Sequence, residues 1–265
     1  MTSLLRFTRV FDEALRHVYS MAMLLYETLY WTFVAPFYRK SYQLREVWVQ
    51  MDRVGIQSFS IVSLVTFLIG MILVLQTAYL VEPYGQLEVV PGGVAVSLTR
   101  EIGPLLVAIV VTGRVGAAYA AELGAMNVAD EIMALECMAV NPVGFLIAPR
   151  FLALMVMLPI LTIYGDFMGM IGGYLVGVYH YGISPNVYYE NTFDFMQKKD
   201  LISGLAKSFV FALIVAQVGA YKGFTVEGGG TGVGRATMQA VVLSIVLIIG
   251  SDAIFTAYIN TYFAR

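Results

Sequence analysis

The sequence predicts an all-α integral membrane protein with five transmembrane helices, an N-terminal interfacial helix and a short helix in a cytoplasmic loop. Of its 265 residues, 59% are hydrophobic and only 13% are charged, which is far from the composition of soluble globular domains. The apolar residues also occur in long runs, and crossing the hydrocarbon core takes a run of ~20 residues. Lipid is therefore the predicted surrounding of most of the chain.

The N-terminal segment, residues 1–53, is predicted to stay on one side of the membrane. Residues 17–38 are apolar and aromatic, with Glu27 in the middle. Basic residues flank this stretch on both sides, and the positive-inside rule places both flanks in the cytoplasm. They are Arg6, Arg9, Arg16, Arg39, Lys40, Arg45 and Arg53. An amphipathic helix lying in the interface fits this pattern, and a sixth transmembrane helix is the alternative.

The first transmembrane helix is the clearest, because residues 54–81 carry no charge over 28 positions. The second contains Arg100 and Glu101. A charge costs at least ~2.5 kcal/mol at the centre of the bilayer, so these two side chains are expected to face protein or water. A helix start in the interface is the alternative. The five predicted spans cover residues 54–81, 94–121, 151–181, 201–221 and 236–264.

The third span carries a stripe of small residues on one helical face. Its members follow at a spacing of four: Gly165, Gly169, Gly173 and Gly177. Such a stripe lets a neighbouring backbone approach closely in lipid, and the neighbour is either a helix of the same chain or a second subunit. Asp166 in this span and Asp252 in the fifth are further intramembrane acids.

The distribution of basic residues predicts the orientation. Seven of the sixteen precede position 54, so the N-terminus is expected in the cytoplasm and the C-terminus outside. The loops 122–150 and 222–235 are then cytoplasmic, while the outer loop 182–200 contains Lys198 and Lys199 as a mild violation. No cleavable signal peptide is apparent at the N-terminus.

Residues 122–139 predict an amphipathic helix between two spans. They mix apolar side chains with four acids, and no basic residue occurs between positions 115 and 149. Anionic lipid attracts basic segments instead, so docking into the groove of a partner protein is the better interpretation.

The glycine-rich stretch 227–237 does not predict a nucleotide site. A phosphate-binding loop needs a Gly-Lys-Ser/Thr ending, whereas here Gly234 is followed by Arg235 and Ala236. The stretch is interpreted as a flexible cytoplasmic turn. No metal site or disulfide is predicted either, because the chain has one cysteine, Cys137, and two histidines. We therefore expect no cofactor in this chain.

Several motifs occur in a fixed order across residues 97–151: SLTREIGP, GRVGAAYAAELGAMNVADE, ALECMAVNP and APRF. GVGRAT then precedes the last span, and Asp252 lies inside it. Together they resemble the MlaE permease family of ABC transporters, which includes chloroplast lipid-import permeases. The resemblance covers roughly residues 55–260.

The resemblance implies a permease subunit that moves phospholipids between the inner and outer membranes and so maintains lipid asymmetry. It implies a homodimer around a lipid cavity in the bacterial inner membrane, with ATP and Mg bound by a separate cytoplasmic ATPase. The other implied partners are a periplasmic MCE-domain lipid-binding protein and a small cytoplasmic regulatory subunit.

The resemblance also assigns residues. Arg100 and Glu101 match a pair that faces the lipid cavity, and Gln76 and Tyr79 match its wall. Residues 122–139 match the coupling helix that sits in the ATPase groove. The residues expected at that contact are Glu122, Leu123, Gly124, Met126 and Glu131. The chain departs from the family pattern at Ile132 and Asn141.

Two other classes of protein remain as alternatives. An ion-coupled secondary transporter would use Asp166, Asp252 and Glu101 as its relay, although no inverted repeat is apparent. A membrane-embedded lipid enzyme would need a nucleophile or a metal cluster, for which the sequence offers only isolated residues.

Overall fold

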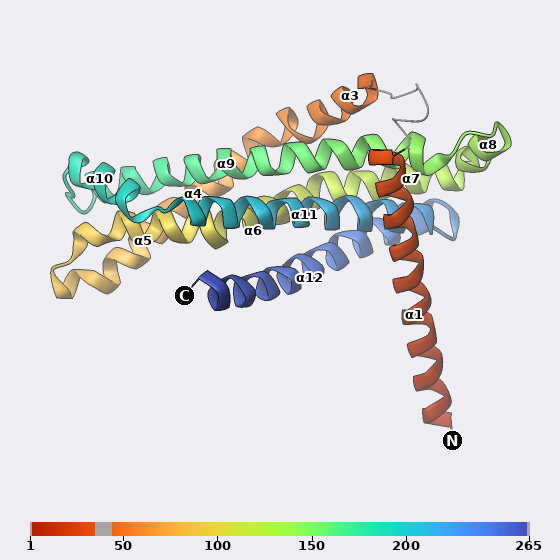
Figure 1. Ribbon diagram of the computed structural model, residues 1–265, viewed down its shortest axis with the longest axis horizontal. Helices are drawn as coiled ribbons and strands as arrows, with labels where there is room; N and C mark the ends of the chain where they lie inside the picture. Colours follow the sequence, from red (N-terminus) through yellow and green to blue (C-terminus); the bar gives the residue numbers. More distant parts are fainter. Residues whose placement is uncertain (1, 35–43, 264–265) are drawn as a thin grey trace.

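The computed structural model describes residues 2–34 and 44–263, and within them the chain is helical without any strand. Five helical segments are long and apolar enough to cross a membrane, which confirms the predicted number. They run over Leu44–Tyr84, Leu87–Val128, Val143–Tyr179, Lys198–Phe224 and Gly229–Ile259. Figure 1 shows these segments side by side as one elongated bundle. Residues 35–38 of the predicted interfacial segment, Arg39, Lys40 and the end of the predicted fifth span lie outside the described residues.

The first segment consists of α3 (Leu44–Val54) and α4 (Ile56–Val81), which meet at Gly55. The second is continuous but contains two π-helical turns. Its parts are α5 (Val90–Ser97), η4 (Leu98–Ile102), α6 (Gly103–Val111), η5 (Thr112–Gly116) and α7 (Ala117–Val128). A short helix, α8 (Glu131–Cys137), follows at the end of the bundle.

The remaining helices complete the bundle. After the π-turn η6 (Val143–Ile147) come α9 (Ala148–Tyr179), α10 (Pro185–Phe195), α11 (Lys198–Phe224) and α12 (Gly229–Phe263). In the most apolar stretch of each helix, 72% of the residues are buried in α9 but only 17% in α12. The centre of the bundle is therefore α9, and α12 lies at its edge.

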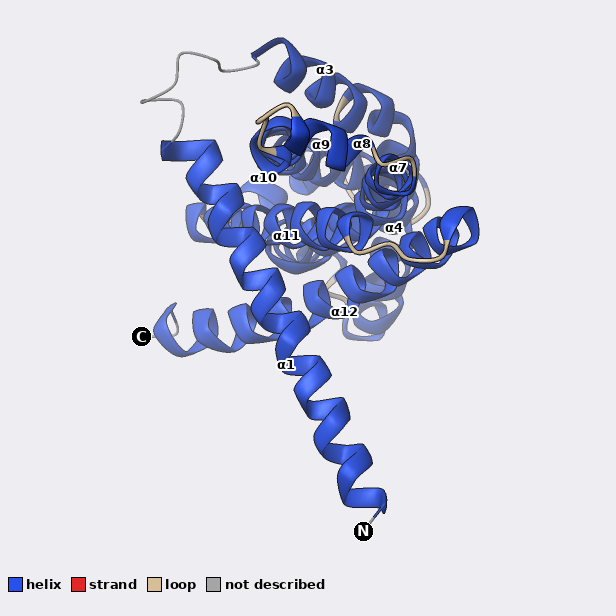
Figure 2. Cartoon of the chain, turned by 90° about the vertical axis from the view of Figure 1, so that its right-hand side faces the viewer, coloured by secondary structure: helices blue, strands red, loops and turns tan. Residues whose placement is uncertain are grey.

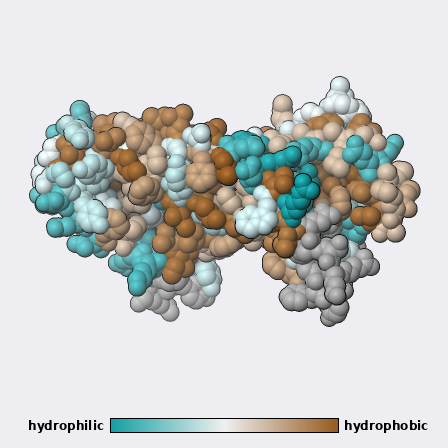
Figure 3. All heavy atoms as spheres, turned by 90° about the horizontal axis from the view of Figure 1, so that it is seen from above, coloured by the Kyte–Doolittle hydropathy of each residue, from teal (hydrophilic) through white to brown (hydrophobic). Residues whose placement is uncertain are grey.

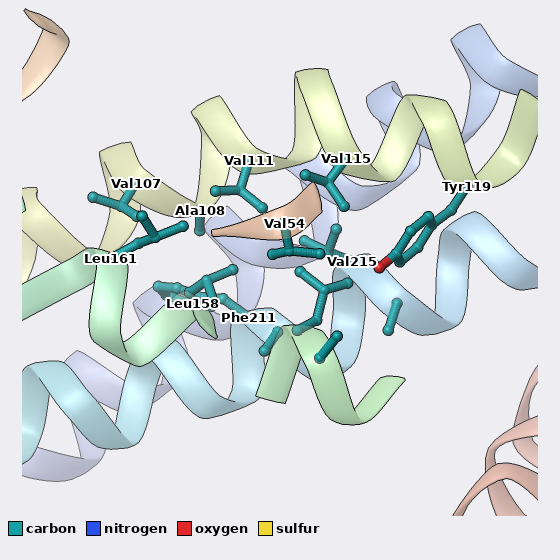
Figure 4. Packing of buried hydrophobic residues seen from close by; sticks show 14 of the residues in the cluster. Val54, Val107, Ala108, Val111, Val115, Tyr119, Leu158, Leu161, Phe211 and Val215 are labelled. Carbon is teal, nitrogen blue, oxygen red and sulfur yellow. The ribbon is translucent and has the colours of Figure 1, made fainter. Parts of the chain in front are cut away.

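The apolar core lies where α3, α6, α7, α9 and α11 meet (Figure 4). Phe211 of α11 and Leu158 of α9 are completely buried there, beside Val107 and Val111 of α6. Lipid is as apolar as these side chains, so close packing rather than the hydrophobic effect holds such helices together.

The glycine stripe of α9 packs inside the chain. Its four glycines are buried, and a side chain at Gly70 of α4 would collide with the backbone of Gly169. Gly173 and Gly177 lie against Tyr188 of α10. The close approach of α4 to α9 therefore depends on glycine from both helices.

The N-terminal helix α1 (Thr2–Leu29), continued by η1 (Tyr30–Val34), is not among the five spanning segments. Figures 1 and 2 show α1 crossing the bundle axis at the end where α7 and α8 lie. His17 Nδ1 lies 2.6 Å from the Tyr221 hydroxyl of α11. The direction of α1, across the axis of the bundle, favours the interfacial helix over a sixth crossing.

The helices differ in detail from those expected. The second segment continues to Val128, so residues 122–139 are divided between α7 and α8 at a turn where Asp130 has φ +58°. The outer loop 182–200 contains α10. The glycine-rich turn is shorter than predicted, because α12 already begins at Gly229. All five spanning segments begin before the predicted apolar run, since helical hydrogen bonding does not stop where the apolar run does.

The surface distribution fits a protein embedded in lipid. Figure 3 shows hydrophobic residues over much of the middle of one face, with hydrophilic residues gathered at its left-hand end and in a patch right of the middle.

Candidate functional site

An ion cluster lies between three helices of the bundle and is centred on Lys207 of α11. The Lys207 side chain is 0% exposed. Its ammonium nitrogen forms an ion pair with Glu101 of η4 and lies 2.9 Å from Asp252 Oδ1 of α12. We call Glu101, Lys207, Asp252 and Thr256 the Lys207 cluster.

Thr256 closes the cluster on the α12 side. Lys207 Nζ donates a hydrogen bond to Thr256 Oγ1 over 2.8 Å. The Thr256 hydroxyl in turn lies 3.1 Å from both carboxylate oxygens of Glu101. The ammonium group therefore donates hydrogen bonds to Glu101 and Thr256, whereas Asp252 Oδ1 lies within ion-pair distance but accepts no hydrogen bond.

The local backbone explains how Glu101 reaches α11. Glu101 lies in a π-helical turn, and Pro104 directly after that turn has no N–H to donate. π-turns of this kind are frequent at functional sites. On the other side, a side chain at Gly204 would collide with the Thr99 carbonyl oxygen, so the α11 backbone comes close to η4. Lys207 is one turn beyond Gly204 and shares its face.

The cluster is stable only as a unit. Each charge alone would cost at least ~2.5 kcal/mol at mid-membrane depth, and removing one partner of a buried pair typically costs about 3–5 kcal/mol. The cluster combines two carboxylates with one ammonium group, and Glu101 is its most exposed charged member, with 31% of the side chain accessible against 15% for Asp252.

The structure brings together two of the residues singled out from sequence, Glu101 and Asp252. Arg100 is half-buried in the same turn, and Gln76 and Tyr79 are exposed on α4. Sequence reasoning missed Lys207 and Thr256. Lys207 had a clear signal, because it is the one charged residue between positions 201 and 221.

Asp166 lies elsewhere. It is 3% exposed in α9, its Oδ1 atom has no hydrogen-bond partner, and it packs against Gly103 just after the π-turn.

A second polar cluster lies where α3, α7 and α9 meet, near α8. Glu122 accepts a hydrogen bond from Arg150 over 3.0 Å and forms a 3.5 Å ion pair with Arg53. Arg150 also donates to the Leu146 carbonyl oxygen over 2.8 Å and lies over the Tyr119 ring. These contacts tie Glu122 to its own chain.

The other residues expected at the ATPase contact have different surroundings. Leu123 and Gly124 are buried within the chain, Met126 is half-buried, and Glu131 at the start of α8 is exposed. On α8, Ile132 points inward, whereas Met133 is 61% exposed and Met138, just after the helix, is 65% exposed. At this end of the bundle α8 therefore presents exposed apolar side chains.

These features define a multi-pass membrane protein with a charged site held between its helices. Its sequence matches the permease MlaE family over residues 47–258. The chain belongs to this family and is an ABC transporter permease.

Three relatives illustrate the range of similarity. A probable ABC transporter permease protein of Rickettsia typhi is 38% identical over 207 residues, which is 78% of this chain and 80% of that protein. Another from Synechocystis is 39% identical over 203 residues, 77% of each chain. The intermembrane phospholipid transport system permease protein MlaE of Haemophilus influenzae is 34% identical over 211 residues, with 78% and 80% covered.

Proposed function

We propose that the chain is the membrane subunit of a transporter that moves phospholipid, with ATP hydrolysed by a separate ATPase subunit. The observation that carries the proposal is the Lys207 cluster, a charged site between apolar helices with Glu101 at its accessible side. A phospholipid needs both environments at once, a polar site for the headgroup and apolar surface for the tails. The H. influenzae relative, named as a phospholipid transport permease, supports this substrate.

The lipid cavity is proposed to form between two copies of the chain. The outward faces of α4 and α12 carry exposed apolar side chains, among them Leu68, Leu75, Val246 and Ile249. Gln76 and Tyr79 are exposed on α4 and would line the cavity wall. Arg100 and Glu101 would contact the headgroup.

Coupling to the ATPase is proposed to run through α8. Its exposed Met133 and the neighbouring Met138 offer an apolar contact, and Glu131 and Glu136 give the same surface an acidic rim. The hydrogen bond from Arg150 of α9 to Glu122 of α7 would transmit movement of the α7–α8 end of the bundle to α9. Closure of two ATPase subunits would then collapse the cavity, and lipid binding would differ between the two states.

The proposed setting is the bacterial inner membrane, with the N-terminus and α8 in the cytoplasm. A periplasmic MCE-domain lipid-binding protein would exchange lipid with the cavity. A small cytoplasmic regulatory subunit would complete the assembly.

The test is to purify the full chain from membranes together with its ATPase and to identify retained lipid by mass spectrometry. We expect phospholipid with the wild type and less of it, with weaker lipid-stimulated ATPase activity, after Glu101→Lys. Glu190→Lys, an equal charge change at an exposed position of α10, serves as the control. Absence of phospholipid, together with wild-type ATPase activity of Glu101→Lys, would contradict the proposal.

One observation favours a second candidate, an ion-coupled transporter. Asp166 is buried in α9, and its Oδ1 atom has no hydrogen-bond partner. A carboxyl group that binds and releases an ion would have such an unpaired oxygen. Lipid movement in vesicles that requires an ion gradient and proceeds without ATP would support this candidate.

A further inference from the structure

We infer that the Lys207 cluster selects phospholipids whose headgroup carries a primary ammonium group, of the ethanolamine type, over anionic phospholipids. This inference rests on the proposed function and names the headgroup class for the same site.

Lys207 has no means of binding a phosphate group. Its side chain is wholly buried. Its ammonium group donates hydrogen bonds to Glu101 and, over 2.8 Å, to Thr256, and it forms an ion pair with Asp252 Oδ1 at 2.9 Å. The cation of the cluster therefore stabilises its neighbours rather than an incoming anion.

The accessible side of the cluster is acidic instead. Glu101 and Asp252 retain 31% and 15% of their side-chain exposure, and two carboxylates face one ammonium group. The cluster thus has one surplus negative charge. A carboxylate has about four acceptor positions, so Glu101 keeps acceptor capacity beyond its contacts with Lys207 and Thr256.

The complement of this surface is a cation with N–H donors. Charge-assisted hydrogen bonds of this kind are about twice as strong as neutral ones. A choline headgroup has the positive charge but no N–H donor, and an anionic headgroup meets like charge where screening is weak. Arg100 in the same turn is half-buried and already has an interaction within the chain, so Glu101 is the accessible charged end of the cluster.

The experiment offers the full chain a choice of headgroups with identical tails. The protein is reconstituted into bilayers of equal parts phosphatidylethanolamine, phosphatidylglycerol and phosphatidylcholine, extracted in detergent, and its retained lipid is quantified by mass spectrometry. We expect phosphatidylethanolamine to be enriched about tenfold over phosphatidylglycerol, a preference of about 1.4 kcal/mol, and to exceed phosphatidylcholine as well.

Two variants test whether the preference comes from the cluster. Glu101→Gln removes the surplus charge while leaving Lys207 paired with Asp252, and should bring the retained lipid close to the bilayer composition. Asp252→Asn removes the same charge from the less exposed acid and should reduce the preference, so the test does not depend on one variant folding. Glu190→Gln, the same chemical change on the exposed face of α10, should keep the wild-type preference.

The possible outcomes distinguish a failure of the headgroup preference from a failure of the proposed lipid-transport function. Retained phospholipid with the bilayer composition, a preference for phosphatidylglycerol, equal retention of phosphatidylcholine, or a preference unchanged in Glu101→Gln each overturns the headgroup assignment and leaves the lipid permease intact. Absence of any retained phospholipid refutes the proposed function and this inference with it.

Discussion

Gly204 of α11 faces the carbonyl oxygen of Thr99 so closely that no side chain fits between the two backbones. This approach brings Lys207, one turn further along α11, to the π-turn that carries Glu101. The charged site therefore depends on a close contact between two backbones that carry no charge there.

The first prediction concerns this contact. Gly204→Ala should destabilise the protein by about 1–3 kcal/mol, the usual cost of overpacking a close contact, because the added carbon meets backbone that has little freedom to move. Thermal unfolding of the purified chain in detergent measures the effect. Gly250→Ala in α12 is the matched control, since nothing lies near that position, and equal stability of the two variants would contradict the packing argument.

The second prediction tests whether the Lys207 cluster acts as a unit. Lys207→Met should cost about 3–5 kcal/mol, because it removes the buried cation and leaves the half-buried carboxylates of Glu101 and Asp252 close together without it. Adding Glu101→Gln and Asp252→Asn to the same chain removes both uncompensated charges and should recover most of that loss. Unfolding measurements on the two variants decide the matter: a triple variant less stable than Lys207→Met would rule out charge compensation as the cause.

The third prediction compares the two ion pairs of Glu122. Glu122→Ala should cost about 1.5–3 kcal/mol, since it leaves the nearly buried Arg150 without its carboxylate. Arg53→Ala should cost only about 0–1 kcal/mol, because this pair is solvent-exposed and 3.5 Å long. The same unfolding assay checks both, and similar losses in the two variants would show that Arg150 is not the main partner.

The fourth prediction addresses α8. Met133→Asp should leave the stability of the isolated chain within about 0.5 kcal/mol, because the side chain is exposed, but should weaken capture of the ATPase subunit. Co-purification from membranes measures this. Tyr84→Asp, an exposed change in the turn Glu82–Tyr84 between α4 and α5, lies in a connection that Figure 1 shows at the opposite end of the bundle from α8. It should leave capture unchanged, and equal capture by both variants would count against α8 as the docking surface.

Much of the fold was predictable because apolar run length translates directly into spanning helices. All five runs correspond to spanning helices. The helix ends were less predictable, since the continuation of α7 to Val128 and the break at Asp130 depend on backbone geometry that hydropathy does not encode.

The site was only partly predictable for a related reason. Glu101 and Asp252 attract attention as charges in apolar segments, and Lys207 belongs to the same class. Which charges meet depends on the π-turn before Pro104 and on the close approach at Gly204. Neither feature follows from the spacing of the charged residues in the sequence.

The inward face of α12 changes its chemistry along its length. Every fourth residue faces the bundle, in the order Ala236, Ala240, Ser244, Ile248, Asp252 and Thr256. The first four are buried and form packing contacts, which only another close-packed surface can replace. The last two form polar contacts, for which water or a headgroup can substitute. The two halves of α12 therefore differ in what separation from the bundle costs, and Figure 1 shows that α12 diverges from the bundle toward its C-terminus, the half where a ligand can replace the lost contacts.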